Sequence, residues 1–126
     1  MRLKKFSLTI GVQIFKSVSE EARVRILHLI HTKGELCISD IEHILNFTQT
    51  KTARHLSYLK NSGLLATRKH DQWVFYYLKD EVKEMVNQIF KFLDKDVTLV
   101  QDIEVYNTLF SNRELAKNKL EQKKWQ

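Results

Sequence analysis

The fold of this chain is decided by residues 39–63, which read SDIEHILNFTQTKTARHLSYLKNSG. A short amphipathic segment at 39–46 ends at the tight turn Asn46-Phe47, and a longer segment follows at 49–62. Both segments space their apolar residues as the buried face of a helix does. Two helices joined by a turn of a few residues predict a helix-turn-helix.

Helix-capping residues mark both segments. Ser39 and Glu42 have the spacing of a capping box, so we expect Ser39 to open the first helix. Thr48 is a good N-cap for the second helix. Gly63 supplies the left-handed residue that ends it.

Upstream of this motif, the pattern predicts two more helices. The first covers about Ile10 to Val18, although the apolar residues there also alternate as in a strand. Ser19 is expected to cap the second, because two glutamates follow it, and Gly34 is expected to end it.

Downstream of the motif, two β-like runs at 64–69 and 73–78 predict a hairpin whose tip lacks the usual glycine. Asp80 is expected to cap a further helix that continues to Leu93. Apolar residues then recur at helical spacing from 100 to 110, and a polar, basic stretch ends the chain.

The expected fold class is mainly α with a small β-hairpin, a winged helix-turn-helix with an extended C-terminal helical region. A chain of 126 residues is long enough for one domain. We expect residues 1–95 to form the winged helix-turn-helix core, and residues 96–126 to form a C-terminal helical extension of the same domain.

Charge favours a polyanionic partner. The formal net charge is +6. From His43 to His70 there is no Asp or Glu, while five Lys or Arg residues fall in that window. A helix that enters the major groove needs one apolar side for packing and one polar side without carboxylates, because phosphates repel carboxylates.

The helix at 49–62 meets these requirements. Gln49 is suited to adenine, and Arg54 is suited to guanine or to a phosphate. Hydroxyl and ammonium groups suit phosphates, and the basic end of the hairpin is expected to touch the adjacent backbone or minor groove. The candidate DNA-binding residues are Thr48, Gln49, Thr50, Lys51, Arg54, His55, Ser57, Lys60, Arg68 and Lys69.

Several separate motifs resemble those of the ArsR/SmtB family of repressors. FKSVSEEARVRIL at 15–27 is similar to the family's second helix, and ELCISDI at 35–41 to its ELCVCDL segment. Residues 48–65 match its recognition-helix pattern, and WVFYYL at 73–78 its second wing strand. The resemblance covers about residues 10 to 95.

The resemblance implies a homodimer that binds a pseudo-palindromic operator in double-stranded DNA, usually as a repressor released by a signal. Residues 1–95 are then expected to be the DNA-binding and dimerisation core. In the family, the first and last helices of the core form the dimer interface. The helix at 80–93 also carries more apolar surface than a solvated helix exposes. The candidate interface residues are Ile14, Val82, Met85, Val86, Ile89, Phe90 and Leu93. The alternative is that the C-terminal helix of the same chain covers this face.

The chain departs from the family's metal-sensing members. Ser39 stands where many of them have a second cysteine, which leaves only Cys37, and no histidine lies between Asp80 and Leu93. His28 and His31 have no obvious third ligand. We therefore expect no metal site, no cofactor and no metal sensing of the usual kind. Cys37 is expected to be a small buried residue.

Two other classes of function remain as alternatives. A winged-helix module that binds another protein and no DNA is the main one, and the carboxylate-free window argues against it. An enzyme is disfavoured because the chain has no glycine-rich phosphate loop, nucleophile elbow or paired-carboxylate motif. No apolar run is long enough to span a membrane, and no convincing signal peptide is present, so a cytoplasmic protein is expected.

Overall fold

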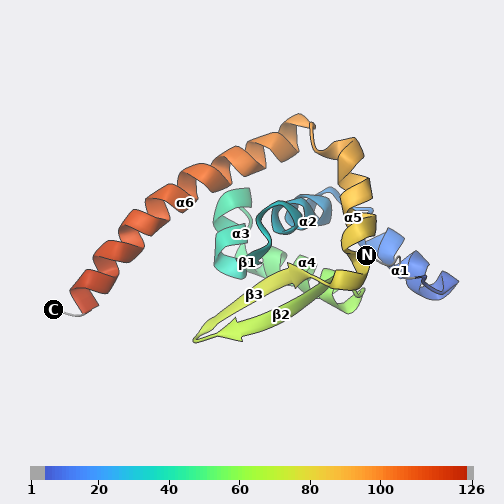
Figure 1. Cartoon of the computed structure of the whole chain (residues 1–126), viewed down its shortest axis with the longest axis horizontal. Helices are drawn as coiled ribbons and strands as arrows, with labels where there is room; N and C mark the ends of the chain where they lie inside the picture. Colours follow the sequence, from blue (N-terminus) through green and yellow to red (C-terminus); the bar gives the residue numbers. More distant parts are fainter. Residues whose placement is uncertain (1–4, 125–126) are drawn as a thin grey trace.

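The computed structural model describes residues 5–124, and the side chains of residues 5–110. Figure 1 shows helices packed around one small sheet, with the last helix reaching past the rest of the molecule. In chain order the elements are α1 (Leu8–Ser17), α2 (Glu21–Lys33), β1 (Glu35–Cys37), α3 (Ile38–Leu45), α4 (Gln49–Asn61), β2 (Leu65–His70), β3 (Trp73–Leu78), α5 (Asp80–Leu93) and α6 (Val97–Lys124).

The predicted helix-turn-helix is present as α3 and α4. The Thr48 hydroxyl accepts a hydrogen bond from the backbone N–H of Lys51 at 3.1 Å, which confirms Thr48 as the N-cap of α4. Gly63, just beyond α4, has a φ of +88°, which only glycine adopts readily. Leu56 and Leu59 are fully buried and dock α4 on the core.

Three predicted N-caps are wrong. The Ser19 hydroxyl donates to the carbonyl of Lys16, so it completes the end of α1, and Glu20 is the N-cap of α2. Ser39 lies inside the first turn of α3, because β1 continues to Cys37 and the helix begins directly after it. Asp80 is the first residue of α5 rather than its cap.

The first segment is a helix, not a strand. The Ser7 hydroxyl accepts from the N–H of Ile10 at 3.2 Å and caps α1 at its start.

The sheet is antiparallel, with the order β1-β3-β2, so β3 is central. β2 and β3 form the predicted hairpin, and His70 pairs with Trp73 across a two-residue turn. Asp71 in this turn has a φ of +55°, a conformation that aspartate tolerates, which is why no glycine is needed at the tip. β1 was not expected from the sequence. It pairs Glu35 with Tyr77 and joins the hairpin to the start of α3.

Helix α2 lies at the centre of the hydrophobic core, and four of its apolar residues are at most 1% exposed: Ile26, Leu27, Leu29 and Ile30. The inner face of α5 packs against it. This contradicts part of the expected dimer interface, because Ile14, Val82, Val86 and Phe90 are at most 2% exposed and belong to the core of their own chain. Met85 and Ile89 are half-buried, and Leu93 is exposed.

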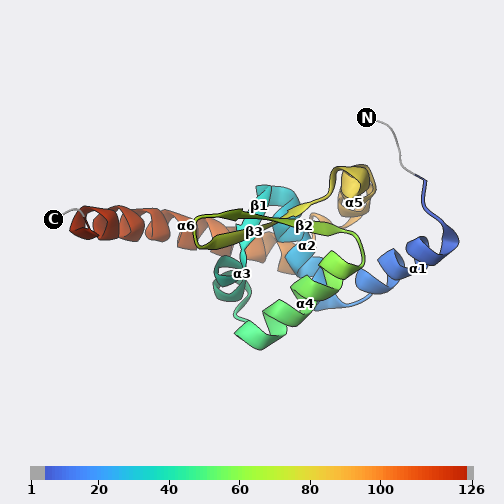
Figure 2. The same cartoon turned by 90° about the horizontal axis from the view of Figure 1, so that it is seen from below.

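Helix α6 runs back over α2 and α3 and then continues beyond them, as Figures 1 and 2 show from two directions. Leu99 is buried in the core. The Arg25 guanidinium donates to both carboxylate oxygens of Asp102, at 2.9 and 2.8 Å, and joins α6 to α2. Over the described residues, no helix combines the length and apolar character that a membrane span requires.

We expect Asp102→Ala to lower the free energy of unfolding by about 1.5–3 kcal/mol, because it removes two charge-assisted hydrogen bonds from a buried carboxylate. Urea denaturation measures the change. Glu104→Gln, an exposed position on the same helix, serves as the control and should change stability by less than about 0.5 kcal/mol. Equal losses in the two variants would contradict a specific role for the Arg25–Asp102 pair.

Candidate nucleic-acid interface

The outer face of α4 is polar and solvent-exposed. Most of the candidate DNA-binding residues on this helix and its cap lie there, and those that are exposed are Thr48, Gln49, Thr50, Arg54, Ser57 and Lys60. Their positions recur with helical periodicity, so they form one continuous face. None of them is a carboxylate. The face therefore offers amide, hydroxyl and cationic groups to an approaching ligand.

Lys51 is held at the start of this face by an aromatic ring. Its ammonium lies 4.0 Å from the centre of the Phe47 ring, a cation–π contact, and its side chain is half-buried. Phe47 is in the turn between α3 and α4 and packs against the core. The turn therefore fixes a positive charge beside the N-terminus of α4.

His55 is the one residue of the candidate set that the structure places inside the protein. It is 2% exposed and lies on the inner face of α4. Its Nδ1 is 3.4 Å from the Arg23 guanidinium, and its Nε2 is 3.4 Å from the Glu20 carboxylate. The expectation that His55 contacts DNA directly is wrong, because the helical period turns this position toward α2.

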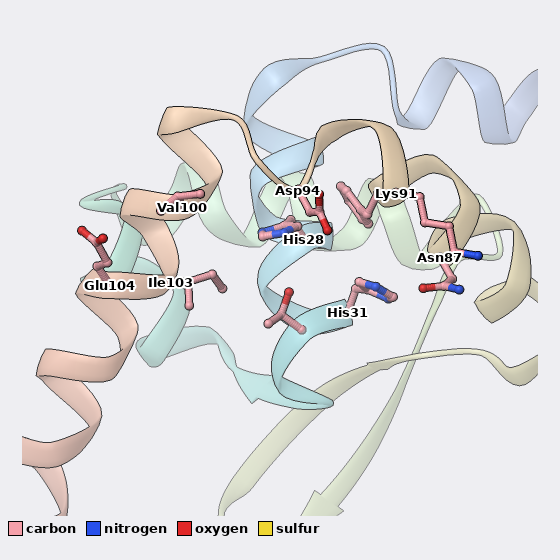
Figure 3. Close-up of a pocket in the computed structure, with 10 residues that line it drawn as sticks. His28, His31, Asn87, Lys91, Asp94, Val100, Ile103 and Glu104 are labelled. Atoms are coloured by element: carbon pink, nitrogen blue, oxygen red, sulfur yellow. The ribbon is translucent and has the colours of Figure 1, made fainter.

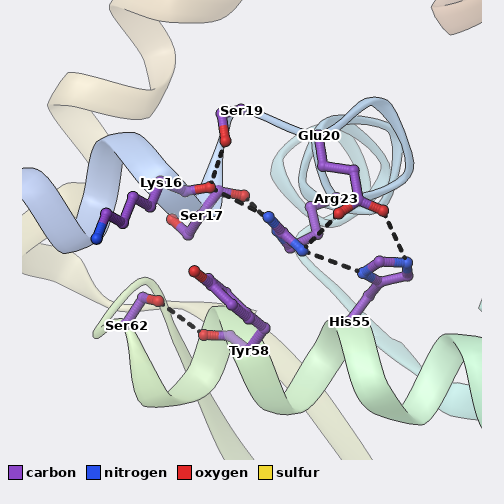
Figure 4. Close-up of polar contacts among 8 residues, drawn as sticks. All are labelled: Lys16, Ser17, Ser19, Glu20, Arg23, His55, Tyr58 and Ser62. Carbon is purple, nitrogen blue, oxygen red and sulfur yellow. Dashed lines mark hydrogen bonds and ion pairs between the residues drawn. The ribbon is translucent and has the colours of Figure 1, made fainter.

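Arg23 organises the contacts behind α4, and Figure 4 shows the group. It is 7% exposed, and its Nε donates to the carbonyl of Ser17 at 2.7 Å. Its two terminal nitrogens donate to the Lys16 carbonyl and the Glu20 carboxylate.

Two further contacts extend this group to α4. The Arg23 guanidinium lies 4.0 Å from the centre of the Tyr58 ring and within 3.4 Å of His55. One buried cation thus joins the end of α1, the start of α2 and the inner side of α4. This role of Arg23 was not predicted from the sequence, although its position in the apolar stripe of α2 is a signal, because arginine is rarely buried.

The hairpin is less cationic than its sequence indicates. Arg68 on β2 donates two hydrogen bonds to the carboxylate of Glu35 on β1, one of them at 2.7 Å, and its guanidinium lies 4.9 Å from the Phe75 ring centre. These hydrogen bonds lower the pKa of Glu35, which stays ionised. A phosphate at Arg68 has to compete with Glu35, whereas Lys69 is exposed.

Known proteins share this fold and these motifs. Residues 20–67 match the family described as bacterial regulatory protein, arsR family. The arsenic resistance transcriptional regulator ArsR1 of Pseudomonas putida is 38% identical over 78 residues, which cover 62% of this chain and 61% of that protein. The matched part of the chain therefore spans about three fifths of this relative's length.

Solved structures share the fold of this chain. HlyU from Vibrio cholerae superposes with a TM-score of 0.63 at 31% identity, covering 69% of this chain and 95% of HlyU. The homodimeric winged helix-turn-helix DNA-binding domain of Mb0332 from Mycobacterium bovis gives a TM-score of 0.64 at 21% identity, covering 70% of this chain and 82% of that one. The predicted fold class, a winged helix-turn-helix, is confirmed.

The surroundings of His55 shift its pKa. Burial lowers the pKa of His55 below the ordinary value of 6.5; Glu20 opposes this shift, while Arg54, Arg23 and Lys51 add to it. We expect Glu20→Gln to lower the pKa of His55 further, because the one facing carboxylate is lost. NMR titration of the imidazole resonances measures the shift.

The control is Glu21→Gln, which removes an exposed carboxylate from the next position of α2 and should leave His55 unchanged. A rise in the pKa of His55 in Glu20→Gln would refute the arrangement. Because the folded pKa lies below the unfolded one, His55 contributes stability that is complete above pH 6.5 and is lost as the pH falls from there through the folded pKa.

Proposed function

The chain belongs to the bacterial ArsR family of regulatory proteins, and we propose that it binds double-stranded DNA as a homodimer and represses transcription. The proposed site is a pseudo-palindromic operator read by the two copies of α4 in a twofold dimer. A regulator of this kind works in the cytoplasm, where bacterial DNA lies.

The observation that carries this proposal is the outer face of α4. It is exposed and free of carboxylates, while the opposite face is anchored by Leu56 and Leu59. Gln49 and Arg54 are suited to base edges, and Thr48, Thr50, Ser57 and Lys60 to phosphates. Lys51 adds positive charge at the start of the helix, and Lys69 adds it on the hairpin. Arg68 can bind a phosphate with its full charge only when its hydrogen bonds to Glu35 are broken.

An apolar surface on α1 and α5 supports the homodimer. Leu8, Phe15 and Phe92 are 85%, 68% and 88% exposed, and Leu93 is 40% exposed. Exposed apolar side chains in this number mark an interface. Figures 1 and 2 show α1 and α5 at the same end of the molecule, opposite the end of α6. The proposed interface therefore retains Met85, Ile89 and Leu93 from the expected set. Leu8, Phe15 and Phe92 take the place of the expected interface residues that are buried in the core.

We also infer that residues 96–126 extend the same domain as residues 1–95. The buried Leu99 and the Arg25–Asp102 pair support this division, because both attach α6 to the core. The side chains of the basic tail, from Lys117 onward, lie outside the described residues, as do residues 1–4.

We expect Arg54→Ala to weaken binding to the DNA upstream of the chain's own gene by about 1–3 kcal/mol, because a base or phosphate contact is lost. Gel-shift titration measures the affinity. Lys83→Ala removes an exposed cation from α5 and is the matched control, with no expected change. An equal loss on unrelated DNA would assign Arg54 to a phosphate rather than to a base.

The same titration separates this proposal from a protein-binding module. Neutralising phosphates releases counterions, so the affinity of a DNA-binding protein falls steeply as salt is raised. Binding that does not change with salt, or no binding to any duplex, would favour the protein-binding module.

We expect Phe92→Glu to convert the dimer to a monomer, because a carboxylate in an apolar interface loses its hydration without a partner. Analytical ultracentrifugation measures the mass. Val105→Glu, at an exposed apolar position of α6, is the control and should remain dimeric. A dimer that persists in Phe92→Glu and dissociates in Val105→Glu would move the interface to α6.

A further inference from the structure

A half-open cleft of about 330 Å³ lies between α2, α5 and α6. Its volume is within the range of small-molecule sites in proteins. Figure 3 shows His28 and His31 of α2 on one side, Asp94 and Lys91 near the end of α5, and Ile103 on α6. Helix α2 and the two consecutive helices α5 and α6 thus contribute to one hollow.

His28 is the buried polar group of this cleft. Its side chain is 4% exposed, and its Nδ1 has no hydrogen-bond partner within the part of the chain that the structure describes. The Phe90 ring meets the His28 ring edge-on at 4.9 Å and stacks on the His31 ring at 5.3 Å. A buried nitrogen without a partner favours a ligand that supplies one.

The charges around the cleft select the sign of that ligand. Asp94 and Glu104 contribute two carboxylates and Lys91 one ammonium, which gives a net charge of −1. The histidines add no charge at neutral pH, because burial lowers the pKa of both; His31 lowers that of His28 further, and Asp94 and Asp102 partly oppose this. The site therefore favours a monocation.

The geometry disfavours a metal ion as that cation. Among the described residues, no three His, Cys, Asp or Glu side chains come together as metal ligands do. Zinc in proteins is normally held by three or four such ligands. Part of the remaining lining is apolar, from Phe90, Val100 and Ile103, and suits a hydrocarbon body, while Thr32 and Asn87 are polar. An organic cation satisfies both parts of the lining.

We propose that the α2–α5–α6 cleft binds a small organic amine with an aromatic or compact apolar body. Its protonated nitrogen lies between the Asp94 carboxylate and His28 Nδ1, donating to both. Its body packs on the wall formed by Val100 and Ile103. In the tautomer that carries its proton on Nε2, His28 accepts this hydrogen bond.

A ligand in this cleft also bears on the proposed function, on which this step rests. Asp94 directly follows Phe92 and Leu93, the exposed apolar residues of the proposed dimer interface. A ligand that holds the end of α5 against α6 favours one arrangement of that interface. It changes DNA affinity to the extent that it binds the DNA-bound and free forms differently.

The test uses the full chain and benzylamine as the probe, followed by NMR of the backbone amides and histidine rings. We expect saturable shifts at His28 and at residues of α5 and α6, with a dissociation constant of about a millimolar for a ligand of this size. Benzoate, with the same ring and the opposite charge, should not bind.

Two variants test the assigned contacts. Asp94→Asn should weaken benzylamine binding by about tenfold or more, because a charge-assisted hydrogen bond is lost. Asp71→Asn, at the exposed hairpin tip, is the matched control and should bind normally. His28→Phe should weaken binding while keeping a ring beside Phe90; if this variant does not fold, Asp94→Asn alone decides.

Shifts confined to other surfaces, equal binding of benzoate, or unchanged affinity in Asp94→Asn would overturn the proposal, as would Zn²⁺ binding to the same histidines in preference to the amine. Gel shifts with and without benzylamine test the second step separately. Amine binding with unchanged DNA affinity keeps the site and removes its regulatory role. Amine binding by a chain that binds no DNA would refute the proposed function and leave the amine site standing.

Discussion

The buried guanidinium of Arg23 is the interaction on which the arrangement of the N-terminal helices depends. A charge in the interior is tolerated only when hydrogen-bond partners surround it, and Arg23 takes its partners from three places. It binds the carbonyl of Ser17 at the end of α1, Glu20 at the start of α2 and His55 on α4. Because these contacts converge on one side chain, Arg23 links α1, α2 and α4 directly. Arg23 therefore connects α1, which carries part of the proposed dimer surface, to α4, which carries the proposed DNA-binding face.

Helix α6 has a different relation to the core. It is attached by Leu99 and by the Arg25–Asp102 pair, and both attachments fall in its first two turns. The same turns form one wall of the cleft that also contains His28. Helix α6 thus completes a hollow that α2 and α5 alone leave open. The first turns of α6 pack on the core, while its distal half extends away from the rest of the molecule (Figure 1).

Local rules predicted the helix-turn-helix well, because Thr48 and Gly63 act within a single helical turn of their own positions. Features that depend on distant partners were missed. The three residues of β1 carry no strand pattern of their own, because the strand depends on pairing with β3. The carboxylate-free window from His43 to His70 likewise could not show that Glu35, outside the window, pairs with Arg68. The amphipathic pattern of α5 identified its apolar residues correctly, but periodicity does not say whether the same chain or a partner covers them. Phe90 was therefore misassigned.

The short strand β1 has a mechanical consequence. Because it runs directly into α3 and pairs with β3, it ties the hairpin to the helix-turn-helix by backbone hydrogen bonds. The Glu35–Arg68 contact stiffens the same joint. We expect a hairpin and helix tied in this way to resist changes in their separation when the groove width of a duplex differs. In the proposed DNA complex the cost of the fit then falls on the nucleic acid, so we expect a preference for sequences that deform easily, even at base pairs that no side chain touches.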